Sequence, residues 1–255
     1  MLHRCAIILI LGMLAGCATS PTGRHQLIMV PDDQMAAAGA KMYAQMKQQQ
    51  AVVRDPVASS QVTCIVDALL RQLPAGMQQG WEAQVFEDKS ANAFALPGKK
   101  IGVNAGMIKL AQNDAQLAAV IGHEIGHVMA RHASERASMG MLSQIGQEVA
   151  GQINPAGAAV FGLGSQVGIM LPYSRAHEDE ADVIGQNLMA RAGFDPRESI
   201  TLWQLMARQG GAKPPELLST HPANSSRIAE LTANLKVSMP MYQRAWNAGV
   251  RPDCR

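Results

Sequence analysis

Aromatic residues and an excess of one charge are both lacking in this chain of 255 residues. Phe, Trp and Tyr together make up 4% of the sequence, and the formal net charge at neutral pH is only +2. Domains that bind nucleic acid usually carry a basic face, often with aromatic side chains that stack on bases. No such patch occurs in the sequence, and we therefore expect no nucleic-acid partner.

Repeats and long low-complexity segments are also absent, and only 4 residues are cysteine. The absence of a repeat argues against a stacked repeat architecture. With 47% hydrophobic residues, the chain is long enough to form one domain with a proper core.

Local patterns predict a mainly helical α+β fold with one small sheet. Residues 32–50 and 56–73 have helical patterns, and Asp32 is placed to cap the first of them. Residues 81–86 alternate apolar and polar side chains, as a half-buried strand does. A hairpin is expected at residues 92–104, with its turn at Pro97-Gly98.

The most informative motif is H-E-x-x-H, on a helix expected from about Asn113 to beyond Arg136. His123 and His127 are four residues apart, so their imidazoles meet on one helix face and can hold one zinc ion. Glu124 stands between them and is suited to act on a water molecule at the metal. A catalytic zinc site usually needs a third protein ligand and one open position, which the rest of the sequence must supply.

The residues after this motif exclude one class of zinc enzyme. A metzincin has a glycine and then a histidine at intervals of three after the second histidine, and Ala130 and Ala133 stand in those places. At about 100° per helical residue, His132 lies roughly 180° from His123 and about 140° from His127. We therefore expect His132 to be an exposed polar residue that points away from the metal.

A second helix is expected to begin after Ser174, which is suited to cap it, and its first turns are acidic. This second helix can supply the third ligand. Glu178 and Asp182 are the only charges on a face of this helix that is otherwise apolar and should be buried. A buried carboxylate is costly unless it is paired or binds a metal. Glu178 is therefore predicted to be the third zinc ligand, and Asp182 an outer partner of a ligating histidine.

The other polar residues of this second helix have simpler interpretations. Asp179 and Glu180 are expected to be solvated acids of the first turn, where the helix dipole favours them. Glu180 lies about 200° from Glu178 and should be exposed to solvent. His177 is expected to lie at the surface rather than to bind metal.

The spaced motifs together resemble the gluzincin endopeptidases of the HtpX, Oma and BepA kind. The resemblance covers roughly residues 60 to 235 and rests on a set of motifs that follow one another along the chain. These are N-A-F-A-L-P-G at 92–98, H-E-I-G-H at 123–127, P-Y-S-R-x-x-E-x-E-A-D at 172–182, T-H-P at 220–222 and Arg227.

The resemblance implies a zincin-like catalytic domain that binds one zinc ion per chain. In that family the matching residues give the ion three ligands, His123, His127 and Glu178, and make Glu124 the general base. His221 would face the metal, either as a displaceable fourth ligand or as a group that stabilises the oxyanion. Arg227 would lie in the outer layer of the site and assist His221.

Two segments near the site are also interpreted through the resemblance. Asn92, Ala93, Phe94 and Ala95 match the active-site strand of the family, which would bind an extended peptide as one more strand. Residues 139–171 stand where the family has a loop able to cover the site. Two short packed helices would leave the same sequence pattern, so both interpretations stay open.

The N-terminus resembles the signal peptide of a bacterial lipoprotein. Residues 1–4 carry a positive charge, residues 5–14 are almost wholly apolar, and L-A-G-C at 14–17 resembles a lipobox. The apolar run is too short to span a bilayer. We therefore expect a signal peptide at 1–16, acylation of Cys17, a lipidated tether at 17–31 and a peptidase domain at 32–255. A plain secretory signal cut near Ala18 is the alternative.

The expected location decides how the cysteines are interpreted. Ala18 after the acylated residue implies attachment to the outer membrane, facing the periplasm, with the lipid as the membrane anchor. Cys64 and Cys254 are then left in an oxidising compartment, where a disulfide is the simplest outcome. Two unconnected thiols, with Cys64 buried in its helix, remain the alternative.

These observations predict a zinc metalloendopeptidase that is anchored in the bacterial envelope. The resemblance to the family implies that it cleaves unfolded or misassembled envelope proteins. The rival prediction is a chaperone-like assembly factor of the outer membrane, whose zinc site is closed by His221 and does not turn over. Glu124 argues against the rival, because a purely structural zinc site has no use for a general base.

Overall fold

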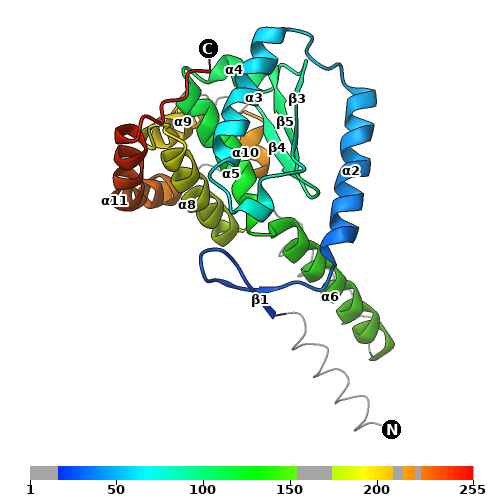
Figure 1. The fold of residues 1–255 in the computed structure, drawn as a ribbon. Helices are drawn as coiled ribbons and strands as arrows, with labels where there is room; N and C mark the ends of the chain where they lie inside the picture. The colour runs from blue at the N-terminus through cyan, green and yellow to red at the C-terminus, as the bar shows by residue number, and fades with distance from the viewer. Residues whose placement is uncertain (1–16, 154–173, 209–214, 222–224, 255) are drawn as a thin grey trace.

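The computed structural model describes residues 17–153, 174–208, 215–221 and 225–254 (Figure 1). Its helices are α2 (Asp32–Gln49), α3 (Pro56–Leu70), α4 (Ala105–Leu110), α5 (Asp114–Met129), α6 (His132–Ile153), α8 (Arg175–Arg191), α9 (Arg197–Arg208), α10 (Leu217–Thr220) and α11 (Ser225–Asn247). Its strands are β1 (Cys17–Thr19), β2 (His25–Leu27), β3 (Glu82–Phe86), β4 (Ala93–Leu96) and β5 (Lys100–Asn104).

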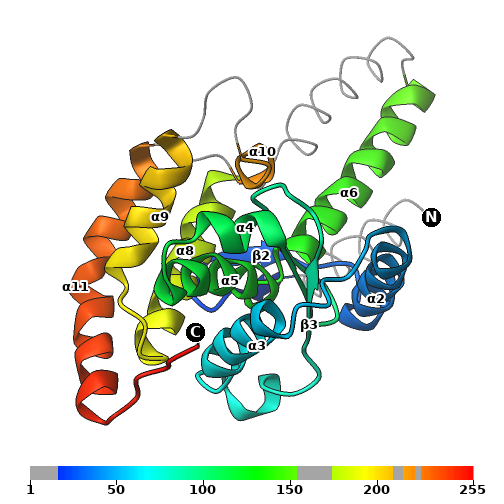
Figure 2. The ribbon, with the colours of Figure 1, turned by 90° about the horizontal axis from the view of Figure 1, so that it is seen from above.

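A three-stranded sheet lies between helix α2 on one side and helices α3 and α5 on the other, in both ribbon views (Figures 1 and 2). Its strand order is β3-β5-β4, with β3 parallel and β4 antiparallel to β5. Helices α8 and α9 pack against α5, and α11 packs outside them. The predicted α+β class, with a small sheet beside the H-E-x-x-H helix, is confirmed.

Helix α5 is the centre of this arrangement. Asn113 caps it by accepting a hydrogen bond from the backbone N–H of Gln116 at 2.8 Å. Every residue from Gln116 to His127 is buried. A helix that is surrounded on all sides needs small and apolar side chains over most of its surface, and the sequence L-A-A-V-I-G supplies them before the first histidine. The polar residues that follow must therefore find partners inside the fold.

The helix predicted to run from Asn113 beyond Arg136 is two helices, and that prediction is wrong. Helix α5 ends at Met129, and α6 begins at His132. Between them Arg131 has a φ of 56°, in the left-handed region that ends many helices. The chain turns at this residue. The helical phase used to place His132 on a far face therefore does not apply to it.

Residues 17–31, predicted to be a tether, begin with a hairpin rather than a free linker. Strands β1 and β2 pair antiparallel, with Cys17 opposite Leu27. The turn is closed by the Gly23 N–H, which donates to the Ser20 carbonyl at 2.9 Å. After the hairpin, the Met29 N–H donates to the Ser138 hydroxyl of α6 at 2.7 Å. The segment is therefore attached to the domain.

Two predicted segments fall partly or wholly outside the described residues. The signal peptide at 1–16 is one of them. Of the segment 139–171, predicted to be a lid or two short helices, the part up to Ile153 continues helix α6, and residues 154–171 lie outside the described chain.

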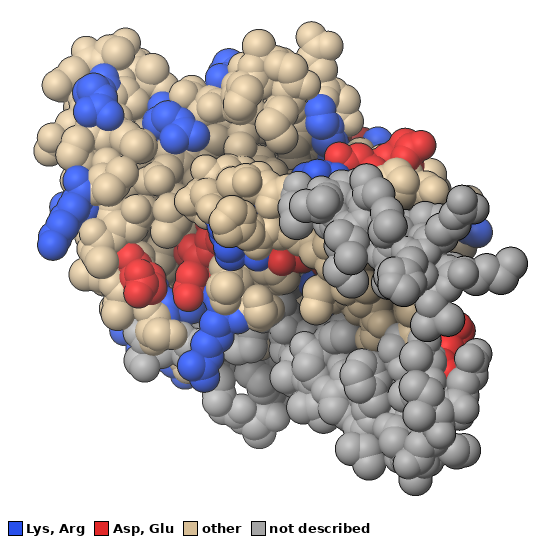
Figure 3. Space-filling model, turned by 90° about the horizontal axis from the view of Figure 1, so that it is seen from below, with Lys and Arg blue, Asp and Glu red and all other residues tan. Residues whose placement is uncertain are grey.

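The surface has no large patch of one charge on the face seen from below, where acidic and basic side chains are interspersed over the described part (Figure 3). Within the described part of the chain, none of the helices combines the length and the apolar character needed to cross a membrane.

A disulfide joins Cys64 of α3 to Cys254 near the C-terminus, with an S–S distance of 2.08 Å. The two cysteines are 190 residues apart in the sequence. Cross-linking such a long loop restricts the unfolded chain and stabilises the fold by about 5 kcal/mol in the loop-entropy model. The bond thus fixes the end of the chain to an early helix.

Close approach of α5 and α8 depends on glycine. A Cβ atom at Gly185 of α8 would lie 2.6 Å from the backbone nitrogen of His123 and 2.8 Å from the carbonyl carbon of Gly122. A Cβ at Gly126 would lie 2.8 Å from the carbonyl oxygen of Ala181. Real Cβ atoms do not approach backbone this closely, so each position requires hydrogen in place of a side chain. The two helices can therefore lie near enough for their polar side chains to meet.

We predict that Gly185→Ala lowers the melting temperature, although alanine normally stabilises a helix interior by about 0.5 to 1 kcal/mol relative to glycine. The added methyl group must push α8 away from α5, at a cost of roughly 1 to 3 kcal/mol. Gly140→Ala in α6 is the matched control, because a Cβ there meets nothing within 4 Å. Thermal unfolding followed by circular dichroism should separate the variants, and equal melting temperatures for the two would contradict this packing argument.

Candidate metal centre

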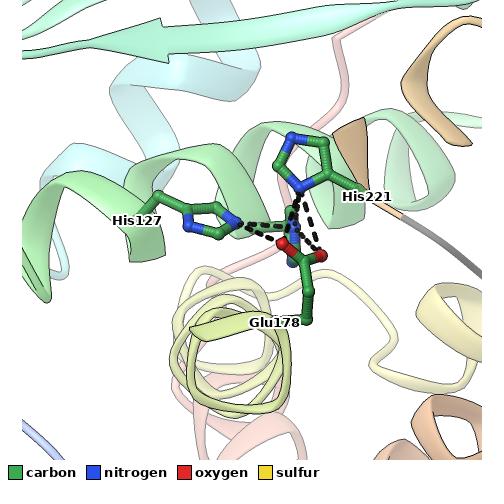
Figure 4. Close-up of side chains that lie close together, drawn as sticks. His127, Glu178 and His221 are labelled. Atoms are coloured by element: carbon green, nitrogen blue, oxygen red, sulfur yellow. Dashed lines mark hydrogen bonds and ion pairs between the residues drawn. The ribbon is translucent and has the colours of Figure 1, made fainter. Parts of the chain in front are cut away.

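Four buried side chains from three parts of the chain meet between α5 and α8. His123 and His127 come from α5, Glu178 from the first turn of α8, and His221 directly follows α10. One donor atom from each residue lies within 4.8 Å of the others, and none of the four residues is more than 4% exposed. Figure 4 shows Glu178 extending from α8 toward His127 and His221. The residues predicted as ligands are thus brought together, with His221 among them.

His123 is held from behind by a carboxylate. Its Nδ1 atom lies 2.9 Å from Oδ1 of Asp182. Asp182 in turn accepts two hydrogen bonds from Arg227, from Nε and from Nη2, both at 2.7 Å. Because a carboxylate can only accept, the proton of a neutral His123 stays on Nδ1, and the lone pair of Nε2 faces the other donors. Asp182 has the outer contact that was expected of it.

Arg227 is also buried, with 1% of its surface exposed. Its Nη1 atom lies 2.9 Å from Oε2 of Glu178, and its guanidinium group stacks over the ring of Trp203 at 3.7 Å. A planar guanidinium with several donors can compensate two carboxylates at once. The group is therefore directed at Asp182 and Glu178, in the outer layer of the site where the sequence placed it.

His127 is held by a second histidine. Its Nδ1 atom lies 2.8 Å from Nδ1 of His132, and Nε2 of His132 lies 3.1 Å from Oε2 of Glu180. The predictions that His132 and Glu180 are exposed are wrong, since they are 0% and 5% exposed. The turn at Arg131 directs His132 back toward α5, where Glu180 meets it.

His177 is likewise not a surface residue. It is 7% exposed, and its ring stacks on that of His132 with a centroid distance of 4.3 Å. Its Nε2 atom lies 3.0 Å from Oε2 of Glu135. Asp179, expected to be solvated, is half-buried. The contacts of His132, His177 and Glu180 behind the metal centre could not be predicted from the sequence. These residues come from different helices, and no local pattern indicates how the helices are placed relative to one another.

Glu124 faces the same centre from α5. Its Oε2 atom accepts a hydrogen bond from the backbone N–H of Ala95 at 3.2 Å. Its Oε1 atom has no hydrogen-bond partner among the described residues and lies 3.5 Å from Nε2 of His221. Burial raises the pKa of Glu124, against the opposing effect of the neighbouring His221 and His123. One carboxylate oxygen is thus directed into the site.

The donor set fits a zinc ion. Imidazole nitrogens with a carboxylate oxygen are usual ligands in catalytic zinc sites. The Nε2 atoms of His123 and His127 are 3.1 Å apart, and when the outer partners hold the proton of each neutral ring on Nδ1, two lone pairs face one another. Such an arrangement requires a shared proton or a cation between the two rings.

Protonation of the donors supports the same conclusion. Burial lowers the pKa of His127 well below its usual value, so this ring is neutral at pH 7, as a ligand must be. Burial also acts on His123, but the carboxylates of Asp182 and Glu178 raise its pKa to about 9. Burial alone would raise the pKa of Glu178, yet hydrogen bonds from His123 and His221 lower it. A zinc ion would therefore displace a proton from His123 on binding.

The strand predicted to bind substrate is an edge strand of the sheet. Among the described residues, strand β4 pairs only with β5. Ala95 donates its N–H to Glu124 and not to β5. Phe94 packs on the other side, with its ring stacked on Phe86 at 5.9 Å and covering Gly102. Asn92 lies just before the strand, where its side-chain amide donates to Glu216 at 3.2 Å. The open edge of β4 therefore faces the candidate centre.

A cavity of about 440 Å³ lies at the end of this edge. Ala95 and His127 line it on the side of the site, and Met35, Met77 and Met129 contribute apolar surface. Methionine side chains are flexible and adapt to ligands of different shape. The cavity has the size and character to take an apolar side chain.

Comparison with known proteins gives a consistent result. The model of the family described as Peptidase family M48 matches residues 56–235. This range includes the four candidate metal-binding residues, His123, His127, Glu178 and His221. The mitochondrial metalloendopeptidase OMA1 of Arabidopsis thaliana is 38% identical over 171 residues, which cover 66% of this chain and 35% of that protein. The protein of the same name in Saccharomyces cerevisiae is 35% identical over 173 residues, covering 65% of this chain and 50% of that one.

A relative with a different name has a lower sequence identity. The beta-barrel assembly-enhancing protease of Yersinia pestis is 28% identical over 211 residues, covering 78% of this chain and 43% of that protein. The matches thus span half or less of the length of each of these relatives.

We predict that Glu178→Gln reduces bound zinc from about one ion per chain to nearly none, because an amide is a poor zinc ligand and leaves Arg227 without its second carboxylate. Asp179→Asn changes the neighbouring carboxylate by the same chemistry and should keep its zinc. Metal analysis after dialysis against a weak chelator measures both. Equal zinc loss in the two variants would show that Glu178 has no special part in binding.

Proposed function

The chain belongs to peptidase family M48, and we propose that it is a zinc metalloendopeptidase that cleaves unfolded or misassembled proteins of the bacterial envelope. In this proposal His123, His127 and Glu178 hold the ion. The observation that carries it is the meeting of this buried donor set with the carboxylate of Glu124, one oxygen of which accepts no hydrogen bond from the described chain.

The roles of the residues follow from their positions. A bound zinc ion supplies polarisation of the scissile carbonyl and activation of a water molecule. Glu124 accepts the proton of the attacking water and delivers it to the leaving amine. Its raised pKa suits this task, because a base works best when its pKa lies near the working pH. His221 stabilises the oxyanion that develops on the carbonyl oxygen.

A second candidate function, the non-catalytic assembly factor, is favoured by one observation. His221 adds a fourth donor to the cluster, and structural zinc sites are usually closed by four protein ligands. In the enzyme, by contrast, His221 would stabilise the oxyanion and would not close the site. Glu124 separates the two proposals, since only the enzyme uses it for turnover.

Recognition of substrate in this proposal occurs through main-chain hydrogen bonds. The outer edge of β4 offers backbone groups to an extended peptide, as edge strands do. Such recognition tolerates many sequences but demands an accessible, extended backbone. Compact folded proteins do not offer one, so unfolded or locally frayed chains are the expected substrates.

The envelope location rests on the N-terminal sequence of this chain. L-A-G-C at 14–17 supports acylation of Cys17 and attachment to the outer membrane, facing the periplasm. The Yersinia pestis relative is named for beta-barrel assembly, which agrees with an envelope protein, whereas the OMA1 relatives are named as mitochondrial. Family membership alone therefore does not decide the compartment.

We predict that Glu124→Gln lowers the rate of casein digestion by about 10² to 10⁴ fold while zinc stays bound, because the change removes the base and leaves the three ligands. Glu87→Gln, at an exposed position, is the control and should digest casein like the parent. Zinc bound by the parent without any digestion would instead favour the assembly factor.

The cavity beside β4 gives a test of substrate preference. We predict that Ala133→Phe fills part of it and lowers kcat/KM by about 10 to 100 fold for peptides with a bulky apolar residue at the scissile bond. Peptides with alanine there should be affected much less. Ala37→Phe, on an exposed part of α2, is the matched control. A uniform loss for both peptides would mean that the cavity does not select side chains.

A further inference from the structure

The two histidines of the H-E-x-x-H motif are held by two chains of hydrogen bonds, and each chain ends at an arginine. The chain behind His123 is short and runs through Asp182 to Arg227, all within the region that matches the family. The chain behind His127 is longer and leaves that region. It ends at Arg24, in the N-terminal hairpin.

Each step of the longer chain is a contact within hydrogen-bonding distance. His127 Nδ1 lies 2.8 Å from His132 Nδ1, and His132 Nε2 lies 3.1 Å from Oε2 of Glu180. Arg24 donates from Nε to the same oxygen of Glu180 at 2.9 Å, and Thr22 donates to its other oxygen at 2.5 Å. Three segments, helices α6 and α8 and the N-terminal hairpin, therefore take part in holding this histidine of α5.

The direction of these hydrogen bonds follows from what each group can donate. The carboxylate of Glu180 only accepts, so Nε2 of a neutral His132 carries the proton. Nδ1 of His132 must then accept, and the proton between the two rings belongs to Nδ1 of His127. That leaves the lone pair of His127 on Nε2, facing the other donors of the metal centre. The chain thus selects the form of His127 that can bind a metal.

Arg24 is the point at which the hairpin joins this chain. While Nε donates to Glu180, Nη1 and Nη2 donate to the two carboxylate oxygens of Glu135 at 2.8 and 2.6 Å. One guanidinium group therefore links α8 to α6. Gln26 supports it by donating to Glu135 at 2.9 Å and to the carbonyl of Ala130, where α5 ends, at 2.6 Å.

We propose that Arg24 is a positioning residue of the metal centre, through which the docked hairpin of residues 17–27 holds His127 in its zinc-binding tautomer and orientation. The inference rests on the zinc site of the proposed function. It assigns the segment next to Cys17 a part in the chemistry: undocking of the hairpin would loosen the metal.

The experiment uses the full chain and four variants. Arg24→Gln removes the charge, and His132→Phe keeps the ring shape but removes both nitrogens. The third variant combines the two changes, and Arg197→Gln is the control, because Arg197 pairs with Asp195 on the surface. Zinc affinity is measured by competition with a chromophoric chelator, and the visible spectrum of the Co²⁺-substituted protein reports the geometry of the ligands.

We expect Arg24→Gln and His132→Phe each to weaken zinc binding by about 10 to 100 fold, as loss of an outer partner of a ligating histidine does. Both should alter the Co²⁺ spectrum in the same way. The double variant should bind zinc no more weakly than the single variant with the lower zinc affinity. The reason is that the two residues act along one chain of hydrogen bonds. Arg197→Gln should match the parent in both measurements.

The inference is overturned if Arg24→Gln melts at a lower temperature yet binds zinc with the affinity and Co²⁺ spectrum of the parent. That result would leave Arg24 a merely structural residue. Glu180→Gln, which keeps the size of the side chain, decides the question by the same readouts if Arg24→Gln does not fold. A parent chain that binds no zinc would instead refute the proposed function itself.

Discussion

The rest of this structure depends on the compensation of charge buried between α5 and α8. Glu124, Glu178 and Asp182 are all nearly inaccessible to water, and an isolated carboxylate in such a place would be very unfavourable. Histidines on one side of these carboxylates and Arg227 on the other compensate the negative charge. Glycines at the crossing of the helices bring these groups within hydrogen-bonding distance. A metal ion bound where these donor atoms converge would add positive charge beside the carboxylates.

The outer partners give the two histidines of the H-E-x-x-H motif different surroundings. His123 is bound directly by Asp182, whereas His127 reaches its carboxylate through His132. Both arrangements direct the Nε2 lone pair inward, but the second depends on residues before position 56, where the match to the family begins. The proposed catalytic residues therefore lie within the part of the chain that matches the family, while the support proposed for His127 belongs to the N-terminal segment.

The strand proposed to bind substrate and the proposed base are linked as well. Ala95 donates its N–H to Glu124, so the edge of β4 and the carboxylate are held in register. A peptide that pairs with this edge lies beside the carboxylate, with the cavity at the end of the strand available for a side chain. In the proposed mechanism, binding by the main chain and cleavage at the metal would thus be neighbouring events.

The sequence by itself determined the periodic and local features. The spacing of His123 and His127 placed both rings on one face, and the apolar face of the second acidic helix picked out Glu178 and Asp182, because helical phase holds within one helix. The predictions from helical phase that His132 and Glu180 are exposed were wrong. One follows a left-handed residue that breaks the helix, and the other is buried by Arg24, which lies 156 residues away in the sequence. Only the tertiary structure decided these contacts, because a buried charge can be recognised as paired only when the segments that supply its partner are placed in space.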